Sequence, residues 1–183
     1  ADASDLHDDP DLMGHVWAGA YLVHPDAVTR VVHDDQGVAG YAVGVPDTAA
    51  FEQWLEHVWL PPLRERYPRG SGTTTGDRAL VEQLHRTPGT DAGLLAAHPA
   101  HLHVDLLPRL QGRGWGRRVV VEVLDGLAGA GAPGAHLGVD EANAGARVFY
   151  ERLGFTALDG PPGARFYGIR LPRPTRRRAP PAP

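Results

Sequence analysis

Residues 102–116 read Leu-His-Val-Asp-Leu-Leu-Pro-Arg-Leu-Gln-Gly-Arg-Gly-Trp-Gly, and this stretch decides the fold. It begins with the alternation of a β-strand and ends in a glycine-rich turn that runs into a helical pattern. Backbone N–H groups at such a turn, with the positive end of the following helix dipole, form an anion site suited to a phosphate. The stretch therefore predicts a cofactor cradle around which the other elements are built.

The glycine spacing excludes two common phosphate loops. A dinucleotide fingerprint does not fit, because glycines stand at positions 112, 114 and 116 while Val119 occupies the place of the last one. A Walker loop does not fit, since no Gly-Lys-Ser/Thr follows the turn. Arg113 and Arg117 add positive charge, which suits a diphosphate.

Composition narrows the class of protein further. The 183 residues suffice for one domain with a sizeable core, and 42% are apolar while 22% are charged. No run of about 18 apolar residues is present, and the chain has no cysteine for disulfides or thiolate metal sites. The net charge is −4, with a basic cluster only at residues 176–178. We expect a cytoplasmic protein that binds neither membranes nor nucleic acid.

Local patterns predict a mixed α/β fold. A carboxylate-rich start at residues 8–11 predicts a short helix to about Tyr21, and Asp47 caps an amphipathic helix. The helix after the glycine turn should bury Val120, Val121, Leu124, Leu127 and Ala128. Strands are expected at 28–33, 38–45, 101–107, 135–139, 155–158 and 166–171, helices at 47–59, 77–85, 114–131 and 143–153, and a loop at 87–99. Residues 1–173 should form one domain, followed by a disordered Pro/Arg tail at 174–183.

The second half of the chain makes a family resemblance visible. Gln111-x-x-Gly114-x-Gly116 is followed about thirty residues later by Asn143 and by Phe149-Tyr-Glu-Arg-Leu-Gly-Phe155. In this order the two motifs resemble the GNAT family of acetyl-CoA-dependent N-acetyltransferases over residues 28–171. Segments 40–48, 59–63, 101–105 and 133–139 further resemble the bacterial relatives of the acetyltransferase-like C-terminal domain of O-GlcNAcase. The resemblance implies a GNAT fold with a helical insertion at residues 47–92, between the third and fourth family strands.

The resemblance also implies roles for single residues. The strand ending at Leu106-Leu107 would diverge from its neighbour and pair with pantetheine, and Asn143 would touch the cofactor near that arm. Tyr150 would protonate the leaving thiolate, since a phenol is mostly protonated at neutral pH. The diphosphate would be held by the turn formed by Gln111, Gly112, Arg113, Gly114, Trp115, Gly116 and Arg117.

The strand before the turn carries a second cluster. Alternation places His101, His103 and Asp105 on one strand face. One interpretation makes Asp105, or His103, the general base that frees the acceptor amine. Another is a zinc hydrolase site, because His-x-His-x-Asp resembles the start of the metallo-β-lactamase zinc motif, with His136 and Asp140 as further ligands. A third is a hydrogen-bonded strand face without chemistry, which we favour for His101; we expect no bound metal.

The resemblance implies direct acetyl transfer from acetyl-CoA to a primary amine within a ternary complex. The acceptor is expected to be a small molecule or a peptide amine, and the alternative is a catalytically degenerate module that only binds acyl-CoA. GNAT domains normally open with a strand and helix, and the first family strand is expected to be missing from this chain. The strand at residues 28–33 would then keep an unpaired edge, which favours a homodimer.

Overall fold

The computed structural model describes residues 7–159 and 164–172. Its core is a six-stranded sheet in the order β1-β2-β3-β4-β6-β5, in which only the β3–β4 pair is parallel. The prediction of a mixed sheet is therefore confirmed. The strands are β1 Val28–Asp34, β2 Gly37–Val45, β3 Ala100–Leu106, β4 Gly134–Asp140, β5 Thr156–Leu158 and β6 Ala164–Arg170.

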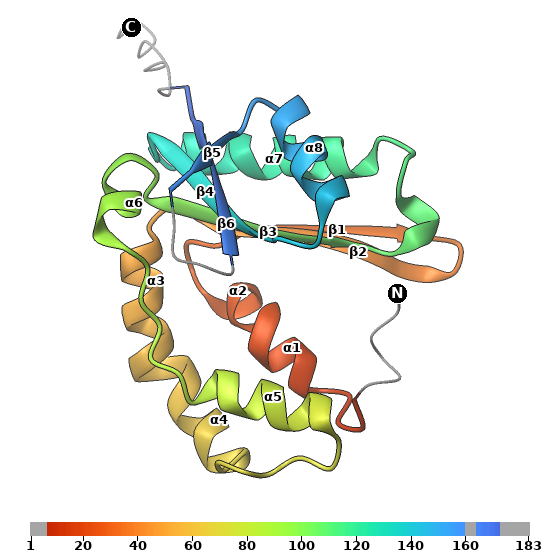
Figure 1. Ribbon diagram of the computed structural model, residues 1–183, viewed down its shortest axis with the longest axis vertical. Coiled ribbons are helices and arrows are strands. Elements are labelled where there is room, and N and C mark those ends of the chain that lie inside the picture. The colour runs from red at the N-terminus through yellow and green to blue at the C-terminus, as the bar shows by residue number, and fades with distance from the viewer. Residues whose placement is uncertain (1–6, 160–163, 173–183) are drawn as a thin grey trace, which may run out of the picture.

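Helices cover both faces of the sheet. Figure 1 shows α7 and α8 on one side and the layer formed by α1 to α5 on the other. None of the helices in the described ranges is long and apolar enough to cross a membrane. The helices are α1 Leu12–Trp17, α2 Gly19–Val23, α3 Thr48–Trp54, α4 Leu60–Arg66, α5 Thr75–Leu84, α6 Ala92–Ala97, α7 Trp115–Gly129 and α8 Ala144–Arg152, with a π-helical turn η2 at Leu55–Trp59 and a 3₁₀ turn η3 at Pro108–Leu110.

The main core lies between the sheet and helices α7 and α8. From α7 it takes Val120, Val123 and Leu127, each fully buried, because these positions follow the 3.6-residue period. The prediction that Val121 is buried is wrong: it is 37% exposed and lies off that stripe. Removing such a large apolar surface from water supplies the main stabilisation of the fold.

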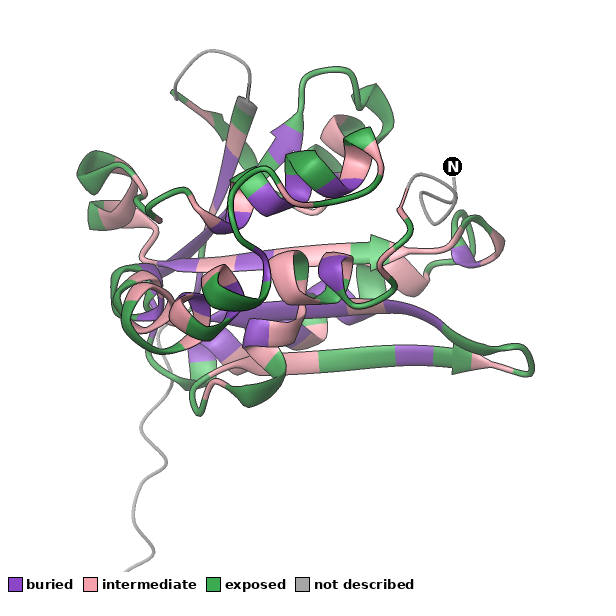
Figure 2. Cartoon of the chain, turned by 90° about the horizontal axis from the view of Figure 1, so that it is seen from below, coloured by how far each residue is buried: buried purple, intermediate pink, exposed green. Residues whose placement is uncertain are grey.

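Strand β1 forms one edge of the sheet. It pairs only with β2 among the described residues, and six of its seven residues are exposed or half-buried, as Figure 2 shows in green and pink. Val32 is its one buried residue. The expected unpaired edge is therefore present, whereas self-association stays a prediction. Gly37 closes the β1–β2 hairpin with φ +106°, a conformation that favours glycine.

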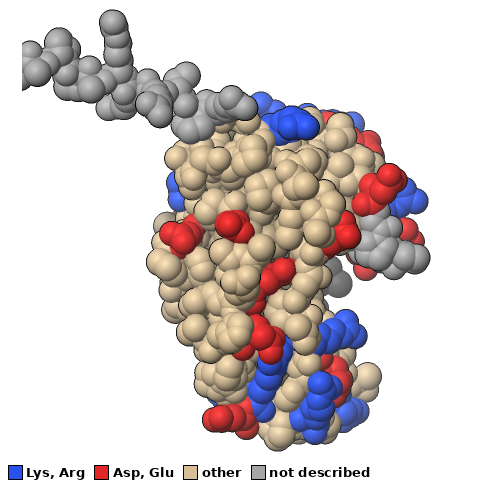
Figure 3. Space-filling view, turned by 90° about the vertical axis from the view of Figure 1, so that its left-hand side faces the viewer, with Lys and Arg blue, Asp and Glu red and all other residues tan. Residues whose placement is uncertain are grey.

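The helical insertion packs with Leu12 of α1 in a second, smaller core, to which it contributes Leu60, Leu63, Tyr67, Leu80, Val81 and Leu84. Asp47 caps α3 as predicted, since its Oδ1 accepts a hydrogen bond from the Ala50 N–H at 3.0 Å. Thr74 and Asp77 form a capping box at the start of α5. Oppositely charged side chains lie side by side at the lower end of the molecule (Figure 3). In the insertion, Arg64 of α4 pairs with Glu56 of η2 at 2.6 Å.

Two local predictions need correction. The stretch 87–99 was expected to be a loop, but it contains α6, whose first N–H groups are capped by Asp91. The single helix expected up to Tyr21 is divided into α1 and α2 at Ala18, whose ψ and φ leave the helical region. The tail expected to be disordered, 174–183, lies outside the described residues.

The close contact between α7 and β1 gives a stability prediction. A Cβ at Gly126 would meet Val28 Cγ1 at 2.6 Å, whereas one at Gly129 of the same helix would meet nothing within 4 Å. Gly126→Ala should lower the free energy of unfolding by about 1–3 kcal/mol through overpacking. Gly129→Ala should leave it unchanged or raise it by up to about 1 kcal/mol. Urea denaturation of both variants checks this, and equal effects would contradict the packing argument.

Candidate active site

The sheet opens between its two parallel central strands. The β3–β4 ladder contains only the pairs Ala100–Ala135 and His101–His136, although both strands continue for several residues. The predicted divergence of the strand ending at Leu106 is thus confirmed. Backbone groups of β3 and β4 beyond His101 and His136 face a gap in which an extended ligand can take the place of a strand.

The glycine turn lies at the end of β3 and starts helix α7. Gly112 and Gly114 have φ +71° and +83°, and Gly114 is the N-cap with no side-chain hydrogen bond to the helix. The first-turn N–H groups of α7 have no intrahelical acceptors and point toward the turn. Gly116 packs so closely that a Cβ there would lie 3.2 Å from Phe149 Cζ on α8. The turn is therefore built as an open anion site.

Side chains hold this turn in place. Gln111 Nε2 donates to the Leu106 carbonyl at 2.9 Å, which ties the turn to β3. Arg109 donates to both carboxylate oxygens of Asp34 at 2.7 and 3.3 Å, and these bonds hold the pKa of Asp34 below its usual range. Arg113 and Arg117 are exposed and make no ion pair with any described residue. Both remain available for an anion.

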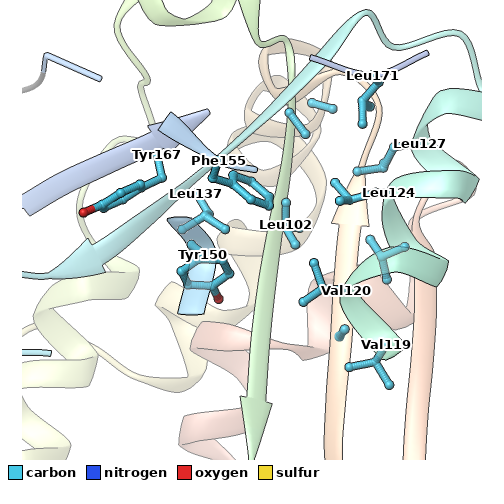
Figure 4. Packing of buried hydrophobic residues seen from close by; sticks show 14 of the residues in the cluster. Leu102, Val119, Val120, Leu124, Leu127, Leu137, Tyr150, Phe155, Tyr167 and Leu171 are labelled. Carbon is cyan, nitrogen blue, oxygen red and sulfur yellow. The ribbon is translucent and has the colours of Figure 1, made fainter. Parts of the chain in front are cut away.

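Tyr150 of α8 lies beside the gap. Figure 4 shows its ring near Leu137 of β4 and Leu102 of β3, and the residue is 8% exposed. Its hydroxyl has no hydrogen-bond partner among the described residues, yet it is not a fully buried atom, so it keeps access to solvent. Burial raises the pKa of Tyr150 to about 12, which keeps the phenol protonated at neutral pH.

Asn143 has a structural task in addition to its predicted contact with a cofactor. It is the N-cap of α8, and its Oδ1 accepts a hydrogen bond from the Ala146 N–H at 3.0 Å. That bond occupies the side-chain oxygen and leaves the amide NH₂ as a donor. A contact between Asn143 and a cofactor stays a prediction.

A cleft of about 460 Å³ reaches the same gap from the opposite face of the sheet. Its floor includes Leu102 and His103 of β3 and Leu137 and Gly138 of β4. Its walls come from α1, α2, α3 and the loop at residues 86–90. The volume is that of a small-molecule site, and its floor belongs to the two strands that separate.

His101 is buried in a satisfied chain of hydrogen bonds. The Thr48 hydroxyl donates to the Pro99 carbonyl at 2.6 Å, so it accepts from the Nδ1–H of His101 at 2.8 Å. His101 Nε2 then accepts from the Tyr21 hydroxyl at 2.6 Å. Both ring nitrogens are used, which supports the hydrogen-bonded role favoured for His101.

His103 and Asp105 take different positions along β3. His103 lines the cleft, contacts the Tyr41 hydroxyl through Nε2 at 3.2 Å and stacks on Trp17. Asp105 is exposed and lies outside the cleft wall, two residues nearer the glycine turn. No group of three His, Asp or Glu side chains suited to a metal ion occurs within residues 7–159 and 164–172.

Sequence reasoning missed several residues of the cleft. Glu52 of α3 binds the loop at 86–90, because its two oxygens accept from the Thr90 hydroxyl at 2.6 Å and from the Thr90 N–H at 3.2 Å. His136 was considered only as a zinc ligand, although it lines the cleft. Glu52 lies on the helical insertion, where no motif marks it. His136 carries a weak signal, as a histidine within an otherwise apolar strand pattern.

Comparisons with known proteins agree with this geometry. A model of the family "FR47-like protein" matches residues 78–160. The crystal structure of SsHAT is 35% identical, with a TM-score of 0.80 over 92% of this chain and 85% of that chain. The GNAT domain of S. lividans PAT shares the fold, with a TM-score of 0.52 at 14% identity over 81% of this chain and 64% of that one.

O-GlcNAcase is similar over a shorter part of its length. The proteins from Rattus norvegicus and Mus musculus are each 23% identical over 148 residues, which is 79% of this chain but 16% of theirs. The fold and the open sheet define an acyl-CoA-dependent acetyltransferase class. The chain belongs to the GNAT family.

The buried histidine gives a pH prediction. Burial, and then the charges of His136 and His103, lower the pKa of His101 to about 3. An unfolded histidine titrates near pH 6.5, so the unfolded chain takes up this proton first as the pH falls. The free energy of unfolding should therefore fall as the pH drops from about 6.5 toward 3. The expected decrease is on the order of a few kcal/mol.

Urea denaturation as a function of pH measures this effect. His101→Gln should flatten the slope below pH 6.5, while His33→Gln, which replaces an exposed histidine on β1, should not. A His101→Gln variant with the full slope would show that other groups cause the acid sensitivity.

Proposed function

We propose that this protein transfers acetyl from acetyl-CoA directly to a primary amine within a ternary complex. The observation that carries the proposal is the gap between β3 and β4, because the cleft is lined on its floor by both of these strands and the glycine turn follows β3 directly. One face of the sheet is suited to the cofactor and the other to the acceptor. Acetyl-CoA supplies an activated thioester.

The residues present fit this cofactor. The first-turn N–H groups of α7 and the glycines at 112 and 114 would hold the diphosphate, with Arg113 and Arg117 adding charge. Unpaired backbone groups of β3 near Leu106 and Leu107 would pair with the amides of pantetheine. Trp115, Gly116 and Gln111 shape the turn, and the Asn143 NH₂ would contact the pantetheine arm.

Tyr150 acts as the proposed general acid. Its phenol holds its proton at neutral pH because burial raises its pKa to about 12. It has no competing acceptor among the described residues. As the C–S bond breaks, the phenol donates this proton to the departing sulfur.

Asp105 is the proposed general base. It is exposed and on the His103 side of β3, so it reaches the cleft through water rather than by direct contact. Its carboxylate takes the ammonium proton before the amine attacks. His103, which lines the cleft, is the alternative base.

Tyr150→Phe tests the acid. The variant should lower kcat by about 10²-fold or more, since it removes the proton donor and keeps the ring. Its affinity for acetyl-CoA should change by less than about twofold, as judged by calorimetry. Wild-type turnover in the variant would refute the assignment. Tight acetyl-CoA binding without product from any amine in the wild type would indicate a binding module instead of an enzyme.

Gly114→Ala tests the diphosphate site. Gly114 and Gly131 both have positive φ, and a Cβ at either would meet nothing within 4 Å, so alanine adds only backbone strain. The strain costs about 1 kcal/mol at each position. Gly114→Ala should weaken acetyl-CoA binding about fivefold, whereas Gly131→Ala, at the other end of α7, should not. Equal affinities in both variants would count against the site.

A further inference from the structure

The cleft is lined by aromatic rings on several elements. Phe166 of β6, His136, His101 and Phe51 form a continuous series with ring centroids 5.5–6.4 Å apart. Tyr21 stacks on Phe51 at 4.8 Å. Flat rings at these spacings offer both faces and edges to a further ring. Each aromatic pair contributes about 0.5–1.5 kcal/mol beyond the free energy gained by burying its surface.

The cleft carries little charge. Among its described lining residues, Glu52 is the only carboxylate and Arg86 the only guanidinium. Both oxygens of Glu52 already accept hydrogen bonds from Thr90. Burial lowers the pKa of His101, His103 and His136, so these rings are neutral at pH 7. A ligand with several ammonium groups would lose its hydration here without gaining counter-charges.

His136 presents one unused acceptor to the cleft. Its Nδ1–H donates to the His98 carbonyl at 2.7 Å, which leaves Nε2 as the unprotonated nitrogen. Nε2 accepts no hydrogen bond from a described donor, although the side chain is 96% buried and lines the cleft. His136 is also the last residue of β4 that pairs with β3 before the gap. An N–H donor bound at Nε2 would lie at the opening between the two faces.

We propose that the cleft binds a small primary amine built on a single aromatic ring, whose amino group donates a hydrogen bond to His136 Nε2. The ring of the ligand lies among the aromatic side chains of the wall. The inference rests on the proposed acetyl transfer, because the bound amine would face the gap that receives the acetyl group. Polyamines and aminoglycosides are excluded as preferred ligands. They carry several positive charges, and the one carboxylate among the described lining residues, Glu52, already accepts two hydrogen bonds from Thr90.

Direct binding tests the proposal without turnover. Calorimetric titration of the protein with 2-phenylethylamine, n-butylamine and spermidine, in the absence of acetyl-CoA, should give at least tenfold tighter binding of 2-phenylethylamine. Equal or tighter binding of n-butylamine or spermidine overturns the inference. A separate titration with acetyl-CoA tests the proposed function, so the two can fail independently.

Variants locate the binding. Trp17, which stacks on His103 and lines the cleft, is 44% exposed, so Trp17→Leu should fold and reduce the preference for the ring at least threefold. Val31→Ala changes an exposed residue of β1 outside the cleft wall and should leave that preference unchanged. The proposed location would be contradicted if both variants kept the preference for the aromatic amine, or if both lost it to the same extent.

A matched pair tests His136. The His136→Asn side chain keeps a donor to the His98 carbonyl and removes the atom at Nε2, whereas His136→Gln reaches the position of Nε2. 2-Phenylethylamine binding should fall at least tenfold in His136→Asn and be partly restored in His136→Gln, with folding of both confirmed by circular dichroism. Full affinity in a folded His136→Asn variant would rule out the hydrogen bond.

Discussion

The rest of the structure depends on the parting of β3 and β4 after two paired residues. Unpaired backbone groups inside a protein are costly, so an open sheet persists only where the strands are held from both sides and where water or a ligand reaches the gap. Here α7 and α8 cover one face and the layer formed by α1 to α5 covers the other. Tyr150, the floor of the cleft and the strand that leads into the glycine turn all lie at this opening.

Contacts with segments that are distant in the sequence hold the opening in place. Arg109 joins the glycine turn to Asp34 of the β1 hairpin, and Gly126 lets α7 approach Val28 of β1. On the other face, Tyr21 and Thr48 fix the ring of His101. Each of these contacts contributes modestly to stability. Together they set where a bound cofactor and a bound amine would meet.

Features that depend on neighbours in the chain could be predicted from the sequence. Gly112 and Gly114, the Asp47 cap and the strand alternation at residues 101–106 follow from local geometry and were identified correctly. The prediction that Val121 is buried was wrong, because three consecutive valines at 119–121 do not show which of them face the core. The cleft could not be predicted at all: Glu52 meets Thr90 across 38 residues, and no local pattern encodes that contact.

The N-terminus of α7 begins at a glycine that offers no side chain to the first-turn N–H groups. These groups depend on water until an anion binds. A bound diphosphate would complete the cap of the longest helix in the described part of the chain, and that helix supplies much of the main core. Affinity for such a ligand and conformational stability would then be thermodynamically linked, so the ligand concentration would set how often the end of this helix frays.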